Sequence, residues 1–549
     1  MKTRLIAAFV LAGCTPSEQH AVDQTITITP QTADVMTCST AQLAAAVTGF
    51  DDLQVSWSAS PGSVDQSGLY TSPMTVQTNA SVTATSKADP NLSATAQVTL
   101  ATAFPSAAQP IGSSPGTDLI GGTVGVYQHE IANKGDRVYT IWPNNPAGSN
   151  TPSVLVARSN DGGVTWQAPA TAVPITLKAG TDTTDSWAEC TAIAIDAANP
   201  DIVYATTRIT GANHYGEMVG APDEPTLIYA VSTDGGATFT QTVLRATTGT
   251  GICADIISPK PNTVIVEDPT GDCDTDRDAW VFSDANRGAG FATGTVVSMN
   301  EYEAHGNTGG LDSADKRACS DPAKLTIEQN GTSGLGGEAT ESPRMFVNAA
   351  GRVCISYVAI ANGLTGTPEH AYEQCSDDLG VTFDAPVTLD PATPAGAGHS
   401  HTVGAFGPNN AAAVAFVHQI GQDGFIFLAT SSDGGETFGA PTQVPTYSLP
   451  DTTTPGPALN PTVLYDATGV LWIAYRVYDG GVSDRIVVDK SCDGGHTWSG
   501  SVLVNGTEQQ IIDATFPNMK WPALFATTGK APRLVATGTG ATDVFDLAP

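Results

Sequence analysis

Basic residues are scarce in this chain. Its 549 residues include 23 lysines and arginines against 55 aspartates and glutamates, which gives a formal net charge of −32 at pH 7. A protein this negative is repelled by nucleic acid and by anionic lipid surfaces. Beyond the first residues, no stretch is apolar for long enough to form a transmembrane helix. The composition therefore argues against nucleic acid as a partner and against a membrane-embedded body.

Charged residues of either sign make up only 14% of the chain, whereas glycine (56) and proline (36) are plentiful. This balance is typical of an exported all-β protein with many tight turns. A length of 549 residues allows two or three domains.

The nine cysteines lack the CxxC or Cys/His spacing of a structural zinc site. Cys354 and Cys375 lie on two apolar runs that flank a turn, which predicts a cross-strand disulfide. Cys190 and Cys253 occupy equivalent positions in neighbouring units of the chain, and Cys38 has no partner in its own domain. Disulfides are expected because an exported compartment permits them.

The first 13 residues predict a secretory signal, because a basic start precedes an apolar run too short to span a membrane. The sequence Leu11-Ala12-Gly13-Cys14 resembles the bacterial lipobox, in which the cysteine is acylated and becomes the first residue. The resemblance implies lipidation of Cys14, and Thr15 after it favours the outer membrane or the cell surface. An ordinary signal peptide cleaved nearby is the alternative. With a lipidated Cys14, the lipid anchor is the only expected contact with a membrane.

One pattern, Ser-x-Asp-x-Gly-x-Thr-aromatic, is complete in five places, and a damaged copy lies at residues 283–291. The copies lie roughly 50 to 90 residues apart, the scale of one propeller blade per copy. The aspartate can bond the amides of its own turn, and the glycine adopts a backbone angle that other residues resist. We therefore expect a structural role for the five aspartates, which are Asp161, Asp234, Asp378, Asp433 and Asp493.

These motifs resemble the Asp boxes, or bacterial neuraminidase repeats, of sialidase-like β-propellers. The resemblance covers about residues 104–549 and implies an all-β propeller whose boxes lie on the rim facing away from the active centre. Asp-box propellers include sialidases, other glycosidases and non-catalytic receptors. The resemblance therefore predicts the fold and leaves the activity open.

The chain divides into a signal peptide (1–13), a tether (14–24), an Ig-like domain (25–101), a linker (102–116) and the propeller (117–549). Residues 25–101 alternate apolar and polar side chains over short runs, as strands of a small β-sandwich do. Trp57 and the segment Gly68-Leu69-Tyr70 resemble bacterial Ig-like domains, and Trp57 is expected in the core.

Seven inner strands can be counted in the propeller region, from residues 124–131 to 523–526, against five or six boxes. The count favours seven blades, with the six blades of sialidases as the alternative. The last unit has three strands and no box. We therefore expect residues 104–111 to supply its outer strand and close the ring, which removes open sheet edges.

Candidate site residues gather in the loops and strand ends opposite the boxes. Arg344 and Arg476 are the expected anchors for an acidic group, because guanidinium groups make bidentate, permanently charged contacts. The Arg-Ile-Pro-like motif that sialidases carry in their first blade is absent from residues 124–131. The catalytic candidates are Glu189, Tyr215, Glu341, Arg344 and Arg476, and the ligand-binding candidates are His214, His399, Trp187 and Trp521.

Asp272, Asp274 and Asp276 alternate along one acidic loop and could offer Ca²⁺ the carboxylate oxygens it prefers. The run lacks the glycine and the glutamate of an EF-hand, so a solvated acidic turn is the alternative. No further cofactor is indicated.

Two functions compete. The first is a surface-anchored propeller that binds extracellular glycans or proteins without catalysis. The second is a glycoside hydrolase of the exo-sialidase type, acting at the mouth of the central channel. The missing arginine motif and the seventh blade favour the first.

Overall fold

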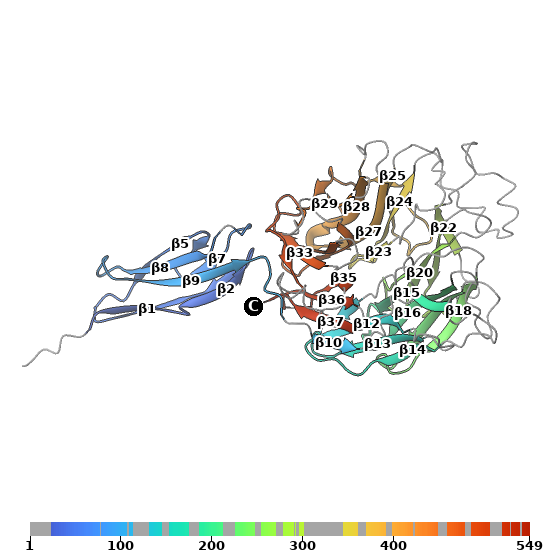
Figure 1. Ribbon diagram of the computed structural model, residues 1–549, viewed down its shortest axis with the longest axis horizontal. Helices are drawn as coiled ribbons and strands as arrows, with labels where there is room; N and C mark the ends of the chain where they lie inside the picture. Colours follow the sequence, from blue (N-terminus) through green and yellow to red (C-terminus); the bar gives the residue numbers. More distant parts are fainter. Residues whose placement is uncertain are drawn as a thin grey trace, which may run out of the picture. The chain divides into compact units, whose positions relative to one another are not determined.

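The computed structural model divides into two compact units, both made of β-strands (Figure 1). The first unit comprises Met1–Val35, Ser39–Pro73 and Gln77–Leu100, and the second comprises Met36–Cys38, Met74–Val76 and Ala101–Pro549. The residues that the structure describes are 23–76, 78–106, 109–112, 131–144, 153–174, 186–211, 226–246, 254–270, 278–289, 291, 296–300, 344–360, 369–390, 398–420, 423–447, 458–477, 485–504, 519–527, 529–538 and 541–548. Among them, the search for a helix long and apolar enough to span a membrane finds none.

The first unit contains three antiparallel sheets around one hydrophobic core. Strand β8 shows how one face of a sheet supplies this core, because its residues alternate strictly between buried and partly exposed positions. Tyr70 lies in the core, and Trp57 packs against it while remaining partly exposed. The strands, in sheet order, are β2 (Thr32–Met36), β9 (Ser93–Ala101), β8 (Ala80–Ser86) and β5 (Val55–Ser60); β1 (Thr25–Thr29) and β4 (Ala44–Thr48); and β3 (Thr40–Gln42), β7 (Leu69–Thr71) and β6 (Ser63–Val64).

The described part of the second unit contains seven four-stranded antiparallel sheets, numbered here in chain order with the inner strand first. Sheets 1 to 3 are β11 (Ile131–Lys134), β12 (Arg137–Asn144), β13 (Ser153–Ser159), β14 (Ala170–Pro174); β15 (Ser186–Ile195), β16 (Val203–Gly211), β17 (Thr226–Ser232), β18 (Thr240–Ala246); and β19 (Asp255–Ile257), β20 (Val264–Thr270), β21 (Asp278–Asp284), β22 (Val296–Asn300). Sheets 4 and 5 are β23 (Arg344–Val347), β24 (Val353–Ile360), β25 (Glu369–Ser376), β26 (Val387–Thr388); and β27 (Gly398–Phe406), β28 (Ala412–Ile420), β29 (Asp423–Ser431), β30 (Thr442–Gln443), with the short helix η3 (Pro408–Asn410) between β27 and β28. Sheets 6 and 7 are β31 (Ala458–Tyr465), β32 (Leu471–Val477), β33 (Arg485–Ser491), β34 (Val502–Leu503); and β35 (Met519–Phe525), β36 (Arg533–Gly538), β37 (Ala541–Asp546), β10 (Gln109–Gly112).

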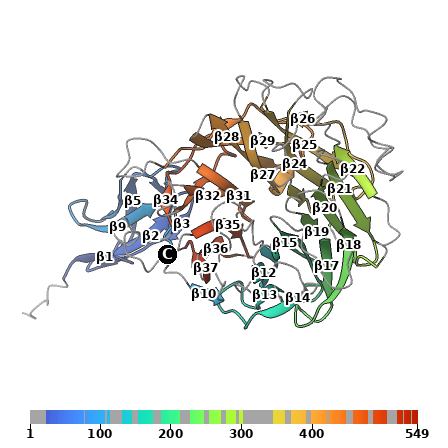
Figure 2. The ribbon, with the colours of Figure 1, turned by 45° about the vertical axis from the view of Figure 1, so that its right-hand side comes forward.

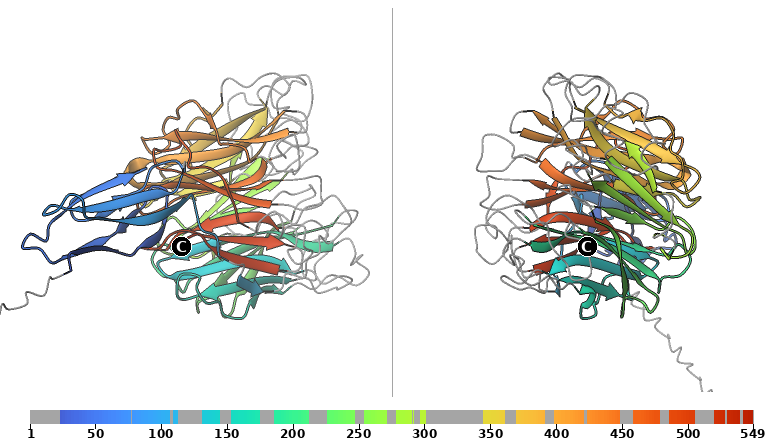
Figure 3. Two further views of the ribbon diagram at one scale, coloured as in Figure 1. Left: turned by 60° about the vertical axis from the view of Figure 1, so that its left-hand side comes forward. Right: turned by 90° about the vertical axis from the view of Figure 1, so that its right-hand side faces the viewer.

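The seven sheets form a closed ring, as a propeller does (Figure 2). Each inner strand contacts the inner strand of the next sheet, and β35 of sheet 7 contacts β11 of sheet 1. Figure 3 shows the cyan sheet 1 and the orange-brown sheet 5 on opposite sides of this ring. Every junction between neighbouring sheets holds its own hydrophobic cluster. Middle strands are therefore buried on both faces, as in β28, where Ala412 to Val417 are all buried.

The expected inner strands agree with the observed ones in sheets 2 to 7 to within a few residues. In sheet 1 the described inner strand is Ile131–Lys134, and residues 124–130 lie outside the described part of the chain. Residues 104–111 were expected to supply the outer strand of the last sheet; in the structure β10 (Gln109–Gly112) pairs with β37, with Gln109 opposite Val544. Sheet 7 has no box because its third and fourth strands come from opposite ends of the unit and share no turn.

All five complete Asp boxes form the same turn between the third and fourth strands of a sheet. In the first, the Asp161 carboxylate accepts hydrogen bonds from the Val164 and Thr165 amides at 3.0 and 2.9 Å and from the Thr165 hydroxyl at 2.5 Å. The Ser159 hydroxyl accepts the Gly163 amide at 2.8 Å. In the second, hydrogen bonds from the Thr238 hydroxyl and amide hold the pKa of Asp234 at about 2. Each box aspartate therefore accepts hydrogen bonds within its own turn, and its structural role stays a prediction.

The damaged sixth box forms a hydrogen-bonded turn that begins one residue later than the sequence pattern indicated. Asp284, rather than Ser283, takes the place of the box serine, and its carboxylate accepts the amides of Asn286 and Gly288 at 2.8 and 2.7 Å. Arg287 and Gly288 have positive φ angles of 58° and 80°, as the two glycines of an intact box do. A carboxylate has therefore replaced the serine hydroxyl as the acceptor.

Two disulfides occur in the described residues, both within the second unit. Cys354–Cys375 joins β24 to β25 and confirms the prediction. The partner of Cys38 is Cys492, which follows the third strand of sheet 6. Cys190 lies on β15 with no side-chain description, and Cys253 lies outside the described residues. Disulfides of this kind are typical of secreted proteins.

Replacing a box aspartate should destabilise the ring without altering a ligand site. We expect Asp161→Ala to lower the free energy of unfolding by about 1–3 kcal/mol, because two turn amides lose their acceptor. Urea denaturation measures the change, and Val164→Ala, an exposed neighbour, should stay within about 0.5 kcal/mol of the parent. An Asp161→Ala protein with unchanged stability would contradict the structural role.

Candidate functional site

Four inner strands carry a β-bulge at the same level, opposite the box end of the sheet. The pairing shifts between Glu189 and Ala192 in β15, Ser400 and Val403 in β27, Leu459 and Thr462 in β31, and Lys520 and Ala523 in β35. Bulges of this kind re-aim side chains and are over-represented next to functional sites. Because the bulges recur in four sheets, this level of the inner strands is the candidate position of a binding or catalytic site.

Two bulge residues have left-handed backbone conformations. His401 has a φ of 50° and Asn460 a φ of 52°. Asn460 is buried, and among the described residues neither its amide nitrogen nor its amide oxygen has a hydrogen-bond partner. Unpaired buried polar groups and left-handed non-glycine residues each cost free energy, and such costs tend to gather at functional sites.

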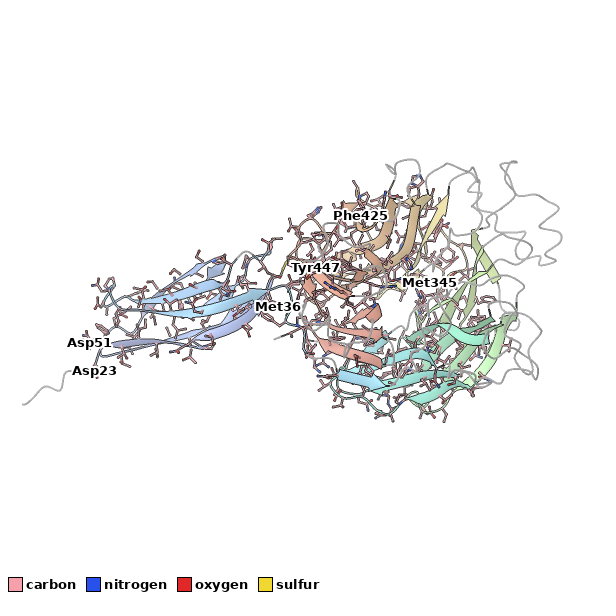
Figure 4. All side chains as sticks on the ribbon, in the orientation of Figure 1. Asp23, Met36, Asp51, Met345, Phe425 and Tyr447 are labelled. Atoms are coloured by element: carbon pink, nitrogen blue, oxygen red, sulfur yellow. A yellow bond between two sulfur atoms is a disulfide. The ribbon has the colours of Figure 1, made fainter. Side chains whose placement is uncertain are left out.

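Charged side chains of sheets 3 and 4 meet at this bulge level. Arg344 of β23 is buried, and its Nη1 lies 3.4 Å from Oδ1 of Asp255 on β19. The Asp255 carboxylate also accepts the amides of Ile256 at 2.8 Å and of Met345 at 2.7 Å; Met345 is labelled in Figure 4. Asp255 thereby ties sheet 3 to sheet 4 and fixes the start of β23.

His401 is held in its neutral form. Burial, Arg344 and Arg476 together lower its pKa to about 4. Arg344 comes from β23 of sheet 4 and Arg476 from β32 of sheet 6, and the positive charge of each opposes protonation of the imidazole. Glu267 on β20 is the strand-pair partner of Asp255 and is fully buried. We call these five residues, Asp255, Glu267, Arg344, His401 and Arg476, the inner-strand cluster.

The cluster can hold an anionic group and move protons. Two permanently charged guanidinium groups favour an anion where little water competes. Two buried carboxylates on paired strands offer acid and base roles. Neutral His401 adds no charge of its own until the pH falls toward 4.

The sequence-predicted residues divide into two groups. Arg344 and Arg476 both lie in the inner-strand cluster. Glu189 and Trp187 lie on β15, His399 on β27 and Trp521 on β35, and the structure describes the backbone of these four but not their side chains. The residues outside the described part of the chain are Cys14, His214, Tyr215, Asp272, Asp274, Asp276 and Glu341.

Sequence reasoning missed Asp255, Glu267 and Asn460. Asp255 and Glu267 stand in short apolar strands, and an ionisable residue at an inward position of such a strand was the available signal. Asn460 precedes Pro461 at a bulge, and no sequence pattern revealed that bulge.

A second cluster of potential ligands lies between sheets 4 and 5. Cys354, Glu373 and Cys375 place one ligand atom each within 4.8 Å of one another. The two cysteines form a disulfide, however, so their sulfur atoms are not available to a metal in this state. Burial raises the pKa of Glu373 well above its usual value, and its Oε2 has no hydrogen-bond partner in the part of the chain that the structure describes.

Glu373 should make the protein less stable as the pH rises. Its folded pKa lies above its unfolded value, so the folded state binds the extra proton and stability falls as the pH climbs above about 4.5. We expect Glu373→Gln to flatten this dependence and to raise the melting temperature at pH 8 more than at pH 4.5. Thermal melts at both pH values measure it, with exposed Glu436→Gln as control. Equal shifts at the two pH values would show that Glu373 is ionised in the fold.

No protein-family model matches the chain, and no curated protein matches it. Among solved structures, it is similar to an α-L-arabinofuranosidase of Fusarium graminearum (13% identity, 65% of this chain, 92% of that chain, TM-score 0.39). It is also similar to an ulvan lyase from a new polysaccharide lyase family (10%, 80%, 95%, TM-score 0.48) and to a Hadza microbial sialidase (12%, 87%, 75%, TM-score 0.39). At these identities and TM-scores the likenesses establish no function for this chain.

Proposed function

We propose that the protein is an exported, sialidase-like Asp-box propeller that binds an acidic extracellular glycan at the inner-strand cluster. The proposal rests on the buried Arg344, whose Nη1 lies 3.4 Å from Asp255 at the bulge level, and on the left-handed bulge of the neighbouring strand β27. The positive charges of Arg344 and Arg476 add to burial in keeping His401 neutral. Guanidinium groups are suited to carboxylate or sulfate groups. The unpaired Asn460 at the neighbouring bulge offers a donor and an acceptor to sugar hydroxyls.

Arg476→Gln tests the proposal. It should lower affinity for acidic glycans at least tenfold, because one of two anion-binding groups is lost, and leave the weak binding of neutral glycans unchanged. A glycan array followed by titration calorimetry measures both. Arg352→Gln is the matched control, since Arg352 pairs with the exposed Asp377 and Asp384 near the Asp-box turn. Equal loss in both variants, or none in Arg476→Gln, would refute the site.

A second candidate function is glycoside hydrolysis. It is supported by Asp255 and Glu267, which face each other across β19 and β20 and could serve as a carboxylate pair. Glu267→Gln should then abolish hydrolysis of fluorogenic glycosides, sialosides included, while glycan binding persists. Absence of turnover in the parent protein would leave binding as the function.

We also propose that residues 25–101 form an Ig-like spacer and that Cys14 carries the lipid anchor. The support is the lipobox-like sequence and the separate core of the first unit. A clickable palmitate analogue should label the protein in bacterial cells and fail to label Cys14→Ala. Labelling of Cys14→Ala would exclude lipidation at this residue.

A further inference from the structure

A groove of about 720 Å³ opens on the Asp-box side of the ring, between sheets 5 and 6. Its walls come from two neighbouring Asp-box turns and from the turns that join the first and second strands of both sheets. This volume is in the range of small-ligand sites. The groove is separate from the bulges of the inner strands, which lie at the other end of the sheets.

The corresponding space between sheets 1 and 2 is filled by two arginines. Arg158 donates to the Gly235 carbonyl at 2.6 Å and to Oε1 of Gln167 at 3.0 and 2.5 Å. Arg137 donates to Asp201 at 2.7 Å. The backbone of the second Asp box is thus bonded by a guanidinium group from the preceding sheet.

Strand register identifies the sheet 5 counterparts of these arginines. Arg158 comes directly before the box serine Ser159, and Thr430 comes directly before Ser431. Arg137 precedes the residue that pairs with Ser159, and Ala411 precedes the residue that pairs with Ser431. Thr430 and Ala411 both line the groove.

The partners of the arginines are also missing from this junction. Gln167 corresponds to Gly439, because each donates its amide to the carbonyl of the residue before the box serine. Asp201 corresponds to Gly469, two residues before the residue that pairs with the box serine of the next sheet. Gly439 and Gly469 line the groove as well. The groove is therefore the space that Arg158, Gln167, Arg137 and Asp201 occupy between sheets 1 and 2.

A third junction shows which chemistry this space accepts. Between sheets 7 and 1, Arg533 donates to the Gly162 carbonyl and Lys530 to the Asp161 carbonyl, both at 2.9 Å. Gly494 is the counterpart of Gly162 and Gly235, and within the described residues no donor reaches its carbonyl. In two junctions, then, the box carbonyl binds a cationic side chain that the groove lacks.

The surroundings of the groove favour a planar cation. Phe438 and Tyr465, both partly buried, line it, and aromatic side chains attract a guanidinium group. Asp493 and His496 also line it; the Asp493 carboxylate accepts the hydrogen bonds of its own turn, and the chain as a whole carries a net charge of −32. We propose that this groove binds an arginine side chain of a partner protein, which completes the junction as Arg158 does between sheets 1 and 2.

The probe is a blocked pentapeptide with one central arginine, compared with the same peptide carrying citrulline, its neutral isostere. Ligand-observed NMR on the full chain at low ionic strength should detect the arginine peptide and not the citrulline peptide. Equal binding of the two peptides would overturn the proposal and favour an uncharged occupant such as a sugar.

Thr430→Arg should fill the groove with the side chain that sheet 1 carries and lower affinity for the arginine peptide at least tenfold. Ala237→Arg, on an exposed box tip outside the groove, is the charge-matched control and should bind like the parent. Parent-like binding by Thr430→Arg, or equal loss in both variants, would refute the groove as the site. The citrulline comparison uses the parent chain, so the test survives if Thr430→Arg fails to fold.

Discussion

Closure of the ring is the constraint on which the rest of the second unit depends. Each sheet is covered on both faces by its neighbours, so an open ring would expose the apolar faces of sheets 1 and 7 to water. Ile111 of β10 and Val544 of β37 pack with Val138 and Trp142 at this last junction. The pairing joins residues 430 to 435 positions apart in the chain. Because loop-closure entropy grows only slowly with length, so distant a pairing can still be stable.

The Asp-box turns have the same structure around one side of the ring. The side chains that contact each box from the preceding sheet differ from junction to junction. The box satisfies its own amides through the serine and the aspartate, and it leaves a backbone carbonyl facing the preceding sheet. That carbonyl receives a guanidinium group at Gly162 and Gly235 and the Tyr229 hydroxyl at Arg287. Diversity in this ring therefore arises at the junctions, where one or two side chains decide whether a space is filled or open.

The sequence predicted the parts of this fold that repeat. The box turns, the inner strands of sheets 2 to 7 and the Cys354–Cys375 bridge follow from local patterns and agree with the structure. Strand β10, which overlaps the segment expected to close the ring, pairs with β37. The register of the sixth box was wrong because the search required a serine where Asp284 supplies the oxygen. Asp255 and Glu267 were missed because their pairing depends on strand register. The groove could not be predicted from the sequence, because it exists where Thr430 and Gly439 are too small to fill the space that larger side chains occupy between sheets 1 and 2.

The charges of the inner-strand cluster are not required by the fold. In sheet 3 the residues paired at this level are Asp255 and Glu267. In sheet 5 the residues paired at the same level are Val403 and Ala415, so an apolar pair can form an equivalent sheet. A buried ion pair such as Arg344–Asp255 gains little stability over apolar side chains of similar volume. Nor does stability require an imidazole kept neutral by two guanidinium groups at a left-handed bulge. Departures from local rules tend to gather at functional sites, and here several of them lie at one level of the ring.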